Sequence, residues 1–336
     1  MFLSLDRSAG VAVGIDFDHD RVRVAVSDLS SNVIAEDCAE IDVDHEAADA
    51  IDAAVEMVSA LLVVANADES SVVGAGVGLP GPIDRRTGTV GSAVILPGWA
   101  GIPAGETLGL RLGVQVQVDN DANLGALAEA SFGAGRGHSD IVYVRLGSGV
   151  GGGLVIGGRL HTGAAGLAGE IGHVQVRPDG AVCRCGNRGC LETIAADAAI
   201  RALLRPTRGH DVTRRELLEL VASGDLGATR VVNDAGRAVG RVLADLCNVV
   251  NPEAIVVGGE LSEAGEPLLS GIREAVDRYA LPGAADVVEV VHGQLGERAE
   301  VLGALALVTQ STDTLRVIGT ESVVSLGHAT GGGSAA

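Results

Sequence analysis

Lysine is absent from this 336-residue sequence, and aromatic residues make up only 2% of it. The 24 basic residues are therefore all arginines, and 44 acidic residues outnumber them to give a net charge of −20. Nucleic acids bind to clustered cations, so this balance argues against a nucleic-acid complex held by this chain alone. No apolar run reaches the ~18 residues that a membrane span needs. Residues 1–10 lack the charged start and apolar core of a secretory signal, so we expect a cytoplasmic protein with no membrane partner.

Cysteine is also scarce, but its placement is informative. Three of the five cysteines lie together at Cys183, Cys185 and Cys190, whereas Cys38 and Cys247 stand alone. In a cytoplasmic chain a tight cluster indicates a metal site more often than disulfides.

The three clustered cysteines combine with His173 in the spacing H-x9-C-x-C-x4-C. Three thiolates and one imidazole match a closed tetrahedral Zn²⁺ site, with no ligand position left for water. Gly186 and Gly189 would let the backbone turn tightly enough to bring the thiolates together. The alternative is a set of buried free cysteines. We expect a structural zinc ion that braces the loop over residues 173–190.

The chain is long enough for about two domains, and its hydrophobic content of 47% suits a well-buried globular protein. Apolar periodicity predicts α/β structure. The predicted strands are Val11–Phe17, Val22–Ser27, Val33–Ile41, Val72–Gly78, Val114–Val118, Ile141–Leu146, Leu154–Ile156, Ile255–Val257 and Val287–Val291. The predicted helices are Glu46–Val64, a helix from Asp119–Asp121 through Ala130, Ala195–Leu204, Thr213–Ala222, Ala228–Val250, Ile272–Tyr279 and Ala299–Thr309.

Two units, each a strand hairpin followed by helices, predict a duplicated α/β architecture with a ligand cleft between two lobes. We place the smaller lobe at residues 1–120 and the larger at 121–298. The last helix, 299–310, is expected to pack back on the smaller lobe, and 311–336 to form a flexible tail.

Two further stretches each have a functional and a plain interpretation. The glycine-rich run 147–153 could cradle a phosphate with its backbone amides, or could be glycine-rich for steric reasons alone. Asp119-Asn120-Asp121 lies where a strand meets a helix. A carboxylate there could act as a general base, or one of the aspartates could simply cap the helix.

Several motifs together resemble the ROK family of repressors, open reading frames and sugar kinases. They are Leu146–Gly153, Glu170-Ile171-Gly172-His173, Cys183–Glu192, Gly78–Pro82, Leu96-Pro97-Gly98-Trp99 and Asn120–Asn123. The resemblance implies an actin/hexokinase-like (ribonuclease H-like) fold of two lobes with a hexose in the cleft. It implies sugar contacts from Gly81, Asn120, Asp121, Glu170, His173 and Glu192, with Asp121 as the base in a kinase. It also implies a nucleotide-phosphate loop made of Gly147, Ser148, Gly149, Gly151 and Gly152, with Gly258 and Gly259 beside it.

The chain departs from the kinase pattern of the family in its first hairpin. Kinases of the family that this chain resembles usually carry Asp-x-Gly-Gly-Thr there, whereas this chain has Asp16-Phe17-Asp18-His19-Asp20. Side chains replace both glycines, and extra carboxylates would face the phosphates of ATP. Ile95 also stands where such kinases often have a sugar-binding asparagine. This hairpin is more similar to that of the family's transcriptional regulators.

Two hypotheses follow. The first is a sugar-sensing regulator core, which the resemblance implies would be a homodimer or tetramer. It would reach DNA only through an N-terminal winged helix-turn-helix domain, for which the ten residues before the first strand leave no room. The second is a glucokinase-like hexose kinase that uses Mg²⁺ and ATP, with Asp121 as base. A purely structural zinc protein is a third, weaker alternative.

Overall fold

The computed structural model describes residues 10–84, 88–90 and 95–310 of the chain. It contains two five-stranded sheets built on the same plan, an antiparallel meander extended by parallel strands. The first sheet has the order β3-β2-β1-β4-β7, from β3 (Val33–Glu40), β2 (Arg21–Asp28), β1 (Val11–Phe17), β4 (Val72–Leu79) and β7 (Val116–Asn120). The second has the order β10-β9-β8-β11-β12, from β10 (Arg159–Leu160), β9 (Val150–Ile156), β8 (Ile141–Leu146), β11 (Ala254–Gly258) and β12 (Glu289–His292).

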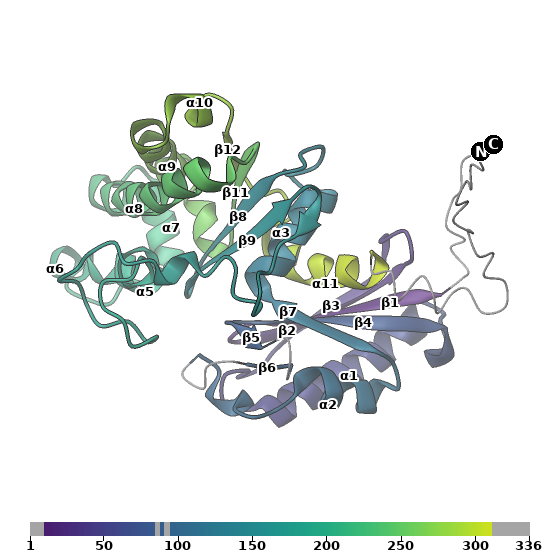
Figure 1. Ribbon diagram of the computed structural model, residues 1–336. Helices are drawn as coiled ribbons and strands as arrows, with labels where there is room; N and C mark the ends of the chain where they lie inside the picture. Colours follow the sequence, from purple (N-terminus) through teal and green to yellow (C-terminus); the bar gives the residue numbers. More distant parts are fainter. Residues whose placement is uncertain (1–9, 85–87, 91–94, 311–336) are drawn as a thin grey trace, which may run out of the picture.

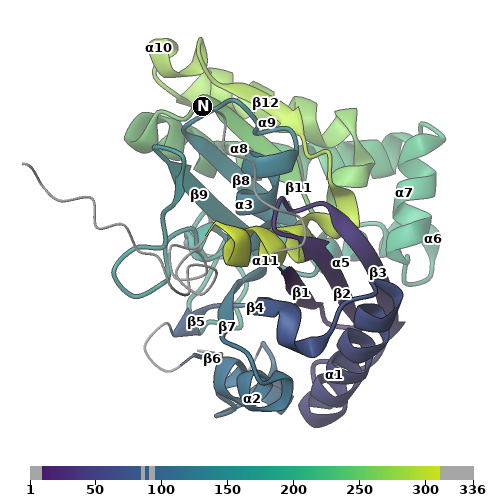
Figure 2. The ribbon, with the colours of Figure 1, turned by 90° about the vertical axis from the view of Figure 1, so that its right-hand side faces the viewer.

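Helices cover both faces of each sheet (Figure 1). On the first sheet, α1 (Ala47–Val64) and α2 (Ala104–Leu112) share one apolar core with the strands, and α11 (Ala299–Thr309) packs on the opposite face. On the second sheet, α8 (Leu226–Val250) and α9 (Glu266–Tyr279) cover one face, and α3 (Asp121–Phe132) packs on β8 and β9. The two views agree that α3 and α11 lie side by side between the sheets (Figure 2). The predicted duplicated α/β architecture is therefore observed.

Short elements complete the chain. The small helices are α4 (Glu192–Ala195), α5 (Asp197–Ala202), α6 (Arg205–Arg208), α7 (Arg214–Ala222) and α10 (Pro282–Ala285). The 3₁₀ turns are η1 (Glu69–Ser71), η2 (Pro97–Trp99), η3 (Ile171–His173), η4 (Glu260–Ala264) and η5 (Gly296–Arg298), and β5 (Ile83–Asp84) pairs with β6 (Thr89–Val90). No helix within the described ranges is both long and apolar enough to span a membrane.

The approach of α3 to α11 depends on a missing side chain. A Cβ atom built on Gly303 of α11 would lie 2.0 Å from the carbonyl oxygen of Leu124 in α3. No larger residue fits there without moving a helix backbone. This contact fixes the start of α3, which carries Asp121, relative to the start of α11.

Several predicted boundaries were wrong. The strand predicted at Val114–Val118 is β7, two residues later, and the helix predicted at Ala195–Leu204 is broken at Ala196, whose backbone is extended. Helix α9 begins at Glu266, six residues before the prediction, because Pro267 occupies its first turn, where proline is tolerated. The predicted flexible tail at 311–336 lies outside the described residues.

The glycine-rich run also differs from its prediction. Only residues 147–149 form the turn, because β9 begins at Val150 and pairs with β8 through Gly151, Gly152 and Gly153. A Cβ on Gly153 would lie 2.5 Å from the Ala122 carbonyl oxygen of α3, so glycine lets this helix pack directly on the strand. For Gly153 the steric interpretation is therefore sufficient.

Candidate functional site

A first cavity of about 510 Å³, partly open to solvent, lies where the two sheets face each other. All six residues predicted to contact a substrate line it, namely Gly81, Asn120, Asp121, Glu170, His173 and Glu192. Four residues of the predicted phosphate loop also line it, namely Ser148, Gly149, Gly151 and Gly152. The folded chain thus brings together segments that are far apart in the sequence.

Asn120 organises the edge of this cavity. Its side-chain oxygen accepts hydrogen bonds from the backbone amides of Ala122 (2.9 Å) and Asn123 (3.3 Å). Its side-chain nitrogen donates to the carbonyl oxygen of Gly81 at 2.8 Å. The cap of α3 is therefore Asn120, so the alternative in which one of the flanking aspartates caps the helix is wrong. It ties the loop at Gly81, where φ is +86°, to the start of the helix.

Asp121 does not act as the helix cap, and it lines the cavity. It is the first residue of α3, and one carboxylate oxygen accepts from the Ala122 amide at 2.8 Å. The other oxygen lies 3.5 Å from Nε of Arg145. Burial raises the pKa of Asp121, although Arg145 and the Ala122 amide oppose that rise. A partly desolvated carboxylate on the wall of a cavity has the placement that a general base or a hydroxyl acceptor requires.

Two glutamates face Asp121 across the cavity. Burial, together with repulsion from Asp121 and Glu192, raises the pKa of Glu170 to about 7. Glu192 is held on both oxygens by the guanidinium of Arg184, at 2.8 and 3.1 Å, and it also accepts from the Val150 amide. Three carboxylates in one cavity offer many acceptor positions for hydroxyl groups.

The candidate metal ligands also converge. The ligand atoms of His173, Cys183, Cys185 and Cys190 all lie within 4.8 Å of one another. The sulfurs of Cys185 and Cys190 are 3.7 Å apart, and Nδ1 of His173 is 3.6 Å from the sulfur of Cys183. Sulfurs bound to one tetrahedral Zn²⁺ at about 2.3 Å would lie about 3.8 Å apart. The donor set and its spacing therefore fit the ion.

The loop that carries the cysteines turns as the glycines predicted. Gly186 has a φ of +90° and Gly189 a φ of +69°. A Cβ on Gly189 would lie within bonding distance of the Arg177 carbonyl oxygen, so glycine is required there. The other ring nitrogen of His173, Nε2, lies 3.8 Å from Glu170. The imidazole thus lies between the cysteine cluster and a wall of the first cavity.

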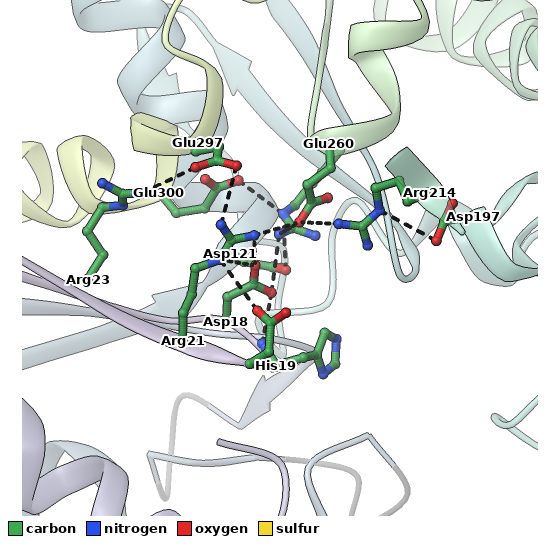
Figure 3. A network of polar contacts seen from close by, with 12 residues as sticks. Asp18, His19, Arg21, Arg23, Asp121, Asp197, Arg214, Glu260, Glu297 and Glu300 are labelled. Atoms are coloured by element: carbon green, nitrogen blue, oxygen red, sulfur yellow. Dashed lines mark hydrogen bonds and ion pairs between the residues drawn. The ribbon is translucent and has the colours of Figure 1, made fainter. Parts of the chain in front are cut away.

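A second cavity of about 490 Å³ lies behind the first. Charged groups dominate its lining, with Asp16, Asp18, Glu260, Glu263, Glu297 and Glu300 facing Arg21, Arg23 and Arg145. Figure 3 shows most of these side chains pointing toward one another from the β1–β2 turn, η4, η5 and α11. Gly259 also lines this cavity, whereas Gly147 and Gly258 line neither cavity.

Close packing explains why glycine occupies positions 258 and 259. A Cβ on Gly258 would lie 2.3 Å from the hydroxyl oxygen of Tyr143, and one on Gly259 would lie 2.5 Å from the Leu146 carbonyl oxygen. Gly259 also has a φ of +78°. These glycines let the chain leave β11 directly over the end of β8.

Arg145 is the residue that sequence reasoning missed. It is 7% exposed, lines both cavities, and lies within 3.5 Å of four carboxylates. A single arginine in the otherwise apolar strand IVYVRL could have revealed it, because a buried charge needs a dedicated partner. Arg184 was also missed, since its role emerges only when the loop folds over Glu192.

The sequence pattern of the ROK family matches residues 12–311. The chain belongs to the ROK family.

ROK relatives of two kinds match most of this chain. The glucokinase of Thermotoga maritima is 38% identical over 264 residues, covering 74% of this chain and 83% of the relative. The xylose repressor of Caldicellulosiruptor bescii is 28% identical over 321 residues, covering 92% and 80%. A solved ROK glucokinase from Streptomyces griseus, in complex with glucose and AMPPNP, has a TM-score of 0.76 at 31% identity, covering 90% of this chain and all of that one. This likeness confirms the actin/hexokinase-like fold of two α/β lobes.

Proposed function

We propose that this chain is the sugar-sensing core of a ROK-type transcriptional regulator. A hexose or a related sugar binds in the first cavity, and the chain does not use ATP. The observation that carries this proposal is the lining of the second cavity, where all three arginines are already paired with carboxylates of the chain.

The second cavity offers poor complementarity to a triphosphate. Arg21 lies within 4 Å of Asp18, Asp20, Glu260 and Glu297, and Arg23 pairs with Glu36 and Glu297. Phosphates placed beside these carboxylates would meet like charges. At 4 Å each such contact costs about 1 kcal/mol in water and about 4 kcal/mol near a protein surface. The glycines that would give phosphates free approach are replaced by Asp18 and His19.

The first cavity, in contrast, keeps what a polyol needs. Asp121, Glu170 and Glu192 supply acceptors, and Asn120 and Arg184 hold two of the segments that present them. An excess of carboxylates favours a neutral or amino sugar over a sugar phosphate, because an added anion would raise the repulsion already felt by Glu170.

A second candidate function is an ATP-dependent hexose kinase. Asp121 lies on the cavity wall with a raised pKa, as expected of a base that takes a proton from a sugar hydroxyl. Relatives at up to 38% identity are named glucokinases. Under this alternative Mg²⁺-ATP would have to displace the ion pairs of the second cavity.

Calorimetric titration separates these two functions. We expect heat from D-glucose or D-xylose, and none from Mg²⁺-ATP with or without sugar. Asp121→Ala should weaken sugar binding about tenfold or more, since it removes a charged acceptor. Asp20→Ala, which changes an exposed aspartate of the nearby turn, should bind sugar normally. Micromolar nucleotide binding would instead establish the kinase, to be followed by a coupled phosphorylation assay.

We further propose that His173, Cys183, Cys185 and Cys190 hold a structural zinc ion. Its chemistry would be purely architectural, because four protein ligands leave no open position. Metal analysis should find about one zinc per chain, and Cys190→Ser should lose it together with sugar affinity. Cys38→Ser, an exposed cysteine outside the cluster, should retain both. Full sugar affinity in metal-free protein would contradict the bracing role.

The homodimer or tetramer that the family resemblance implies is part of the same proposal. Light scattering of the purified chain, with and without sugar, measures it directly.

A further inference from the structure

Arg145 links parts of the molecule that belong to different sheets. It lies near the end of β8 in the second sheet. Its Nη2 is 3.5 Å from Asp18, in the β1–β2 turn of the first sheet, and 3.3 Å from Glu260, which follows β11 of the second. Its Nε is 3.0 Å from Glu300, at the start of α11, and 3.5 Å from Asp121, at the start of α3. We call these five residues the Arg145 cluster.

The geometry makes the carboxylates compete for the guanidinium. Nε carries a single hydrogen, which it donates to Glu300, while Asp121 lies within ion-pair distance of the same nitrogen. Glu300 belongs to the helix that packs on the first sheet, whereas Asp121 faces the first cavity. All five side chains are largely buried, so the electrostatic attraction within each ion pair is stronger than it would be at the surface.

We propose that Arg145 is a positioning residue that couples the first cavity to the contact between the two sheets. A sugar hydroxyl that donates to Asp121 takes over part of the attraction that the guanidinium exerts on this carboxylate. The guanidinium is then drawn more towards Glu300, and the pairing between β8 and α11 strengthens. The inference rests on the proposed sugar binding in the first cavity, and it supplies the differential interaction that any ligand-driven change of arrangement requires.

The state of Glu300 makes this pairing adjustable. Burial raises the pKa of Glu300 to about 7, even though Arg145 lowers it. Near neutral pH the carboxyl group is therefore divided between its two protonation states. A closer contact with the Arg145 guanidinium favours the ionised form of Glu300, which in turn binds the guanidinium more tightly.

The test compares full-length wild type with Glu300→Gln, which keeps an oxygen for the Nε hydrogen but carries no charge. Hydrogen exchange is measured over residues 14–22 and 299–303, and sugar affinity by calorimetry, with D-glucose and D-xylose as probes. In wild type we expect sugar to slow exchange in both segments. In Glu300→Gln the sugar-dependent slowing should disappear, and sugar should bind about fivefold or more weakly, a typical size for coupling between sites.

Two further variants test whether the effect depends on the pairing between Arg145 and Glu300. Arg145→Lys keeps the positive charge but lacks Nε–H, and it should behave as Glu300→Gln does. Glu297→Gln removes a carboxylate of the second cavity that pairs with Arg21 and Arg23 but is not a member of the Arg145 cluster, and it should behave as wild type.

The results distinguish failure of the coupling from failure of the proposed function. Unchanged affinity and unchanged sugar-dependent exchange in Glu300→Gln would overturn the coupling while leaving sugar sensing intact. The same would follow if wild type bound sugar with no change in either segment, or if Glu297→Gln lost the effect equally. A wild-type protein that bound neither sugar would overturn both proposals.

Discussion

Glu300→Gln should make the stability of this protein depend less on pH. Glu300 is 5% exposed, and burial raises its pKa from the ordinary 4.5 to about 7. In the unfolded chain the group loses its proton near the ordinary value. Between these two values the folded state therefore holds a proton that the unfolded state has released.

The sign follows from linkage between proton binding and folding. Below the pKa of the unfolded state, a carboxyl group whose folded-state pKa is raised costs no stability. As pH rises from there through the folded-state pKa, the group lowers the free energy of unfolding. A shift from 4.5 to about 7 corresponds to roughly 3 kcal/mol of stability lost by slightly alkaline pH. Glutamine resembles the protonated form and still accepts from Arg145, which keeps Asp18, Asp121 and Glu260 as partners.

The expected result is a variant equal to wild type at about pH 4 and up to about 3 kcal/mol more stable at about pH 8. Urea unfolding can be followed by fluorescence, because the chain has a single tryptophan, Trp99, which is fully buried and donates to the Val43 carbonyl oxygen at 2.9 Å. The half-exposed Glu297→Gln serves as the control and should show no such pH-dependent difference. If the free energy of unfolding of Glu300→Gln and of wild type changed with pH in parallel, the explanation based on the buried Glu300 charge would be refuted.

Two other predictions test packing and the sugar site. Gly303→Ala should destabilise the fold by about 2 kcal/mol or more, because the new Cβ would lie 2.0 Å from the Leu124 carbonyl oxygen; Gly283→Ala, with open space around it, should leave the urea midpoint nearly unchanged. Arg184→Met should weaken sugar binding about five- to tenfold in calorimetry without loss of zinc, because Glu192 loses the fork that orients it. Unchanged affinity would show that Glu192 is positioned by other groups.

Sequence patterns predicted the strands and long helices because apolar periodicity depends mainly on neighbours along the chain. They also predicted that His173 and the three clustered cysteines come together as a possible metal site, since three thiols and an imidazole at short spacing have few other uses. The glycines of β9 show the limit of this reasoning. Glycine-rich runs suggest a loop, and only the approach of α3 explains why Gly153 can lie in a strand. The break at Ala196 is equally invisible in an alanine-rich stretch.

Arg145 was missed for a different reason. Its importance comes from partners at positions 18, 121, 260 and 300, which no local pattern brings together. Buried ion-pair clusters are assembled by topology, so one member of the cluster seen alone looks like an ordinary charged residue. The predicted substrate residues, all of which line the first cavity, were easier to find because each belongs to a family motif.

The separation of the two cavities bears on how a sensor and a kinase can share one fold. The first cavity is built mainly from the starts of α3 and α4, the turn at η3 and the cysteine loop, whereas the second is built mainly from η4, η5 and α11. The β1–β2 turn contributes His19 to the first cavity and Asp18 to the second. Among the residues described, Arg145 is the only one that lines both. Substitutions in the second cavity can therefore remove complementarity to phosphates without displacing the residues proposed to contact a sugar in the first. A side chain on the shared wall is the exception, because any charge placed there acts on Asp121 as well. An arginine at that position pairs with Asp18, Glu260 and Glu300 of the second cavity and links them to Asp121, which lines the first.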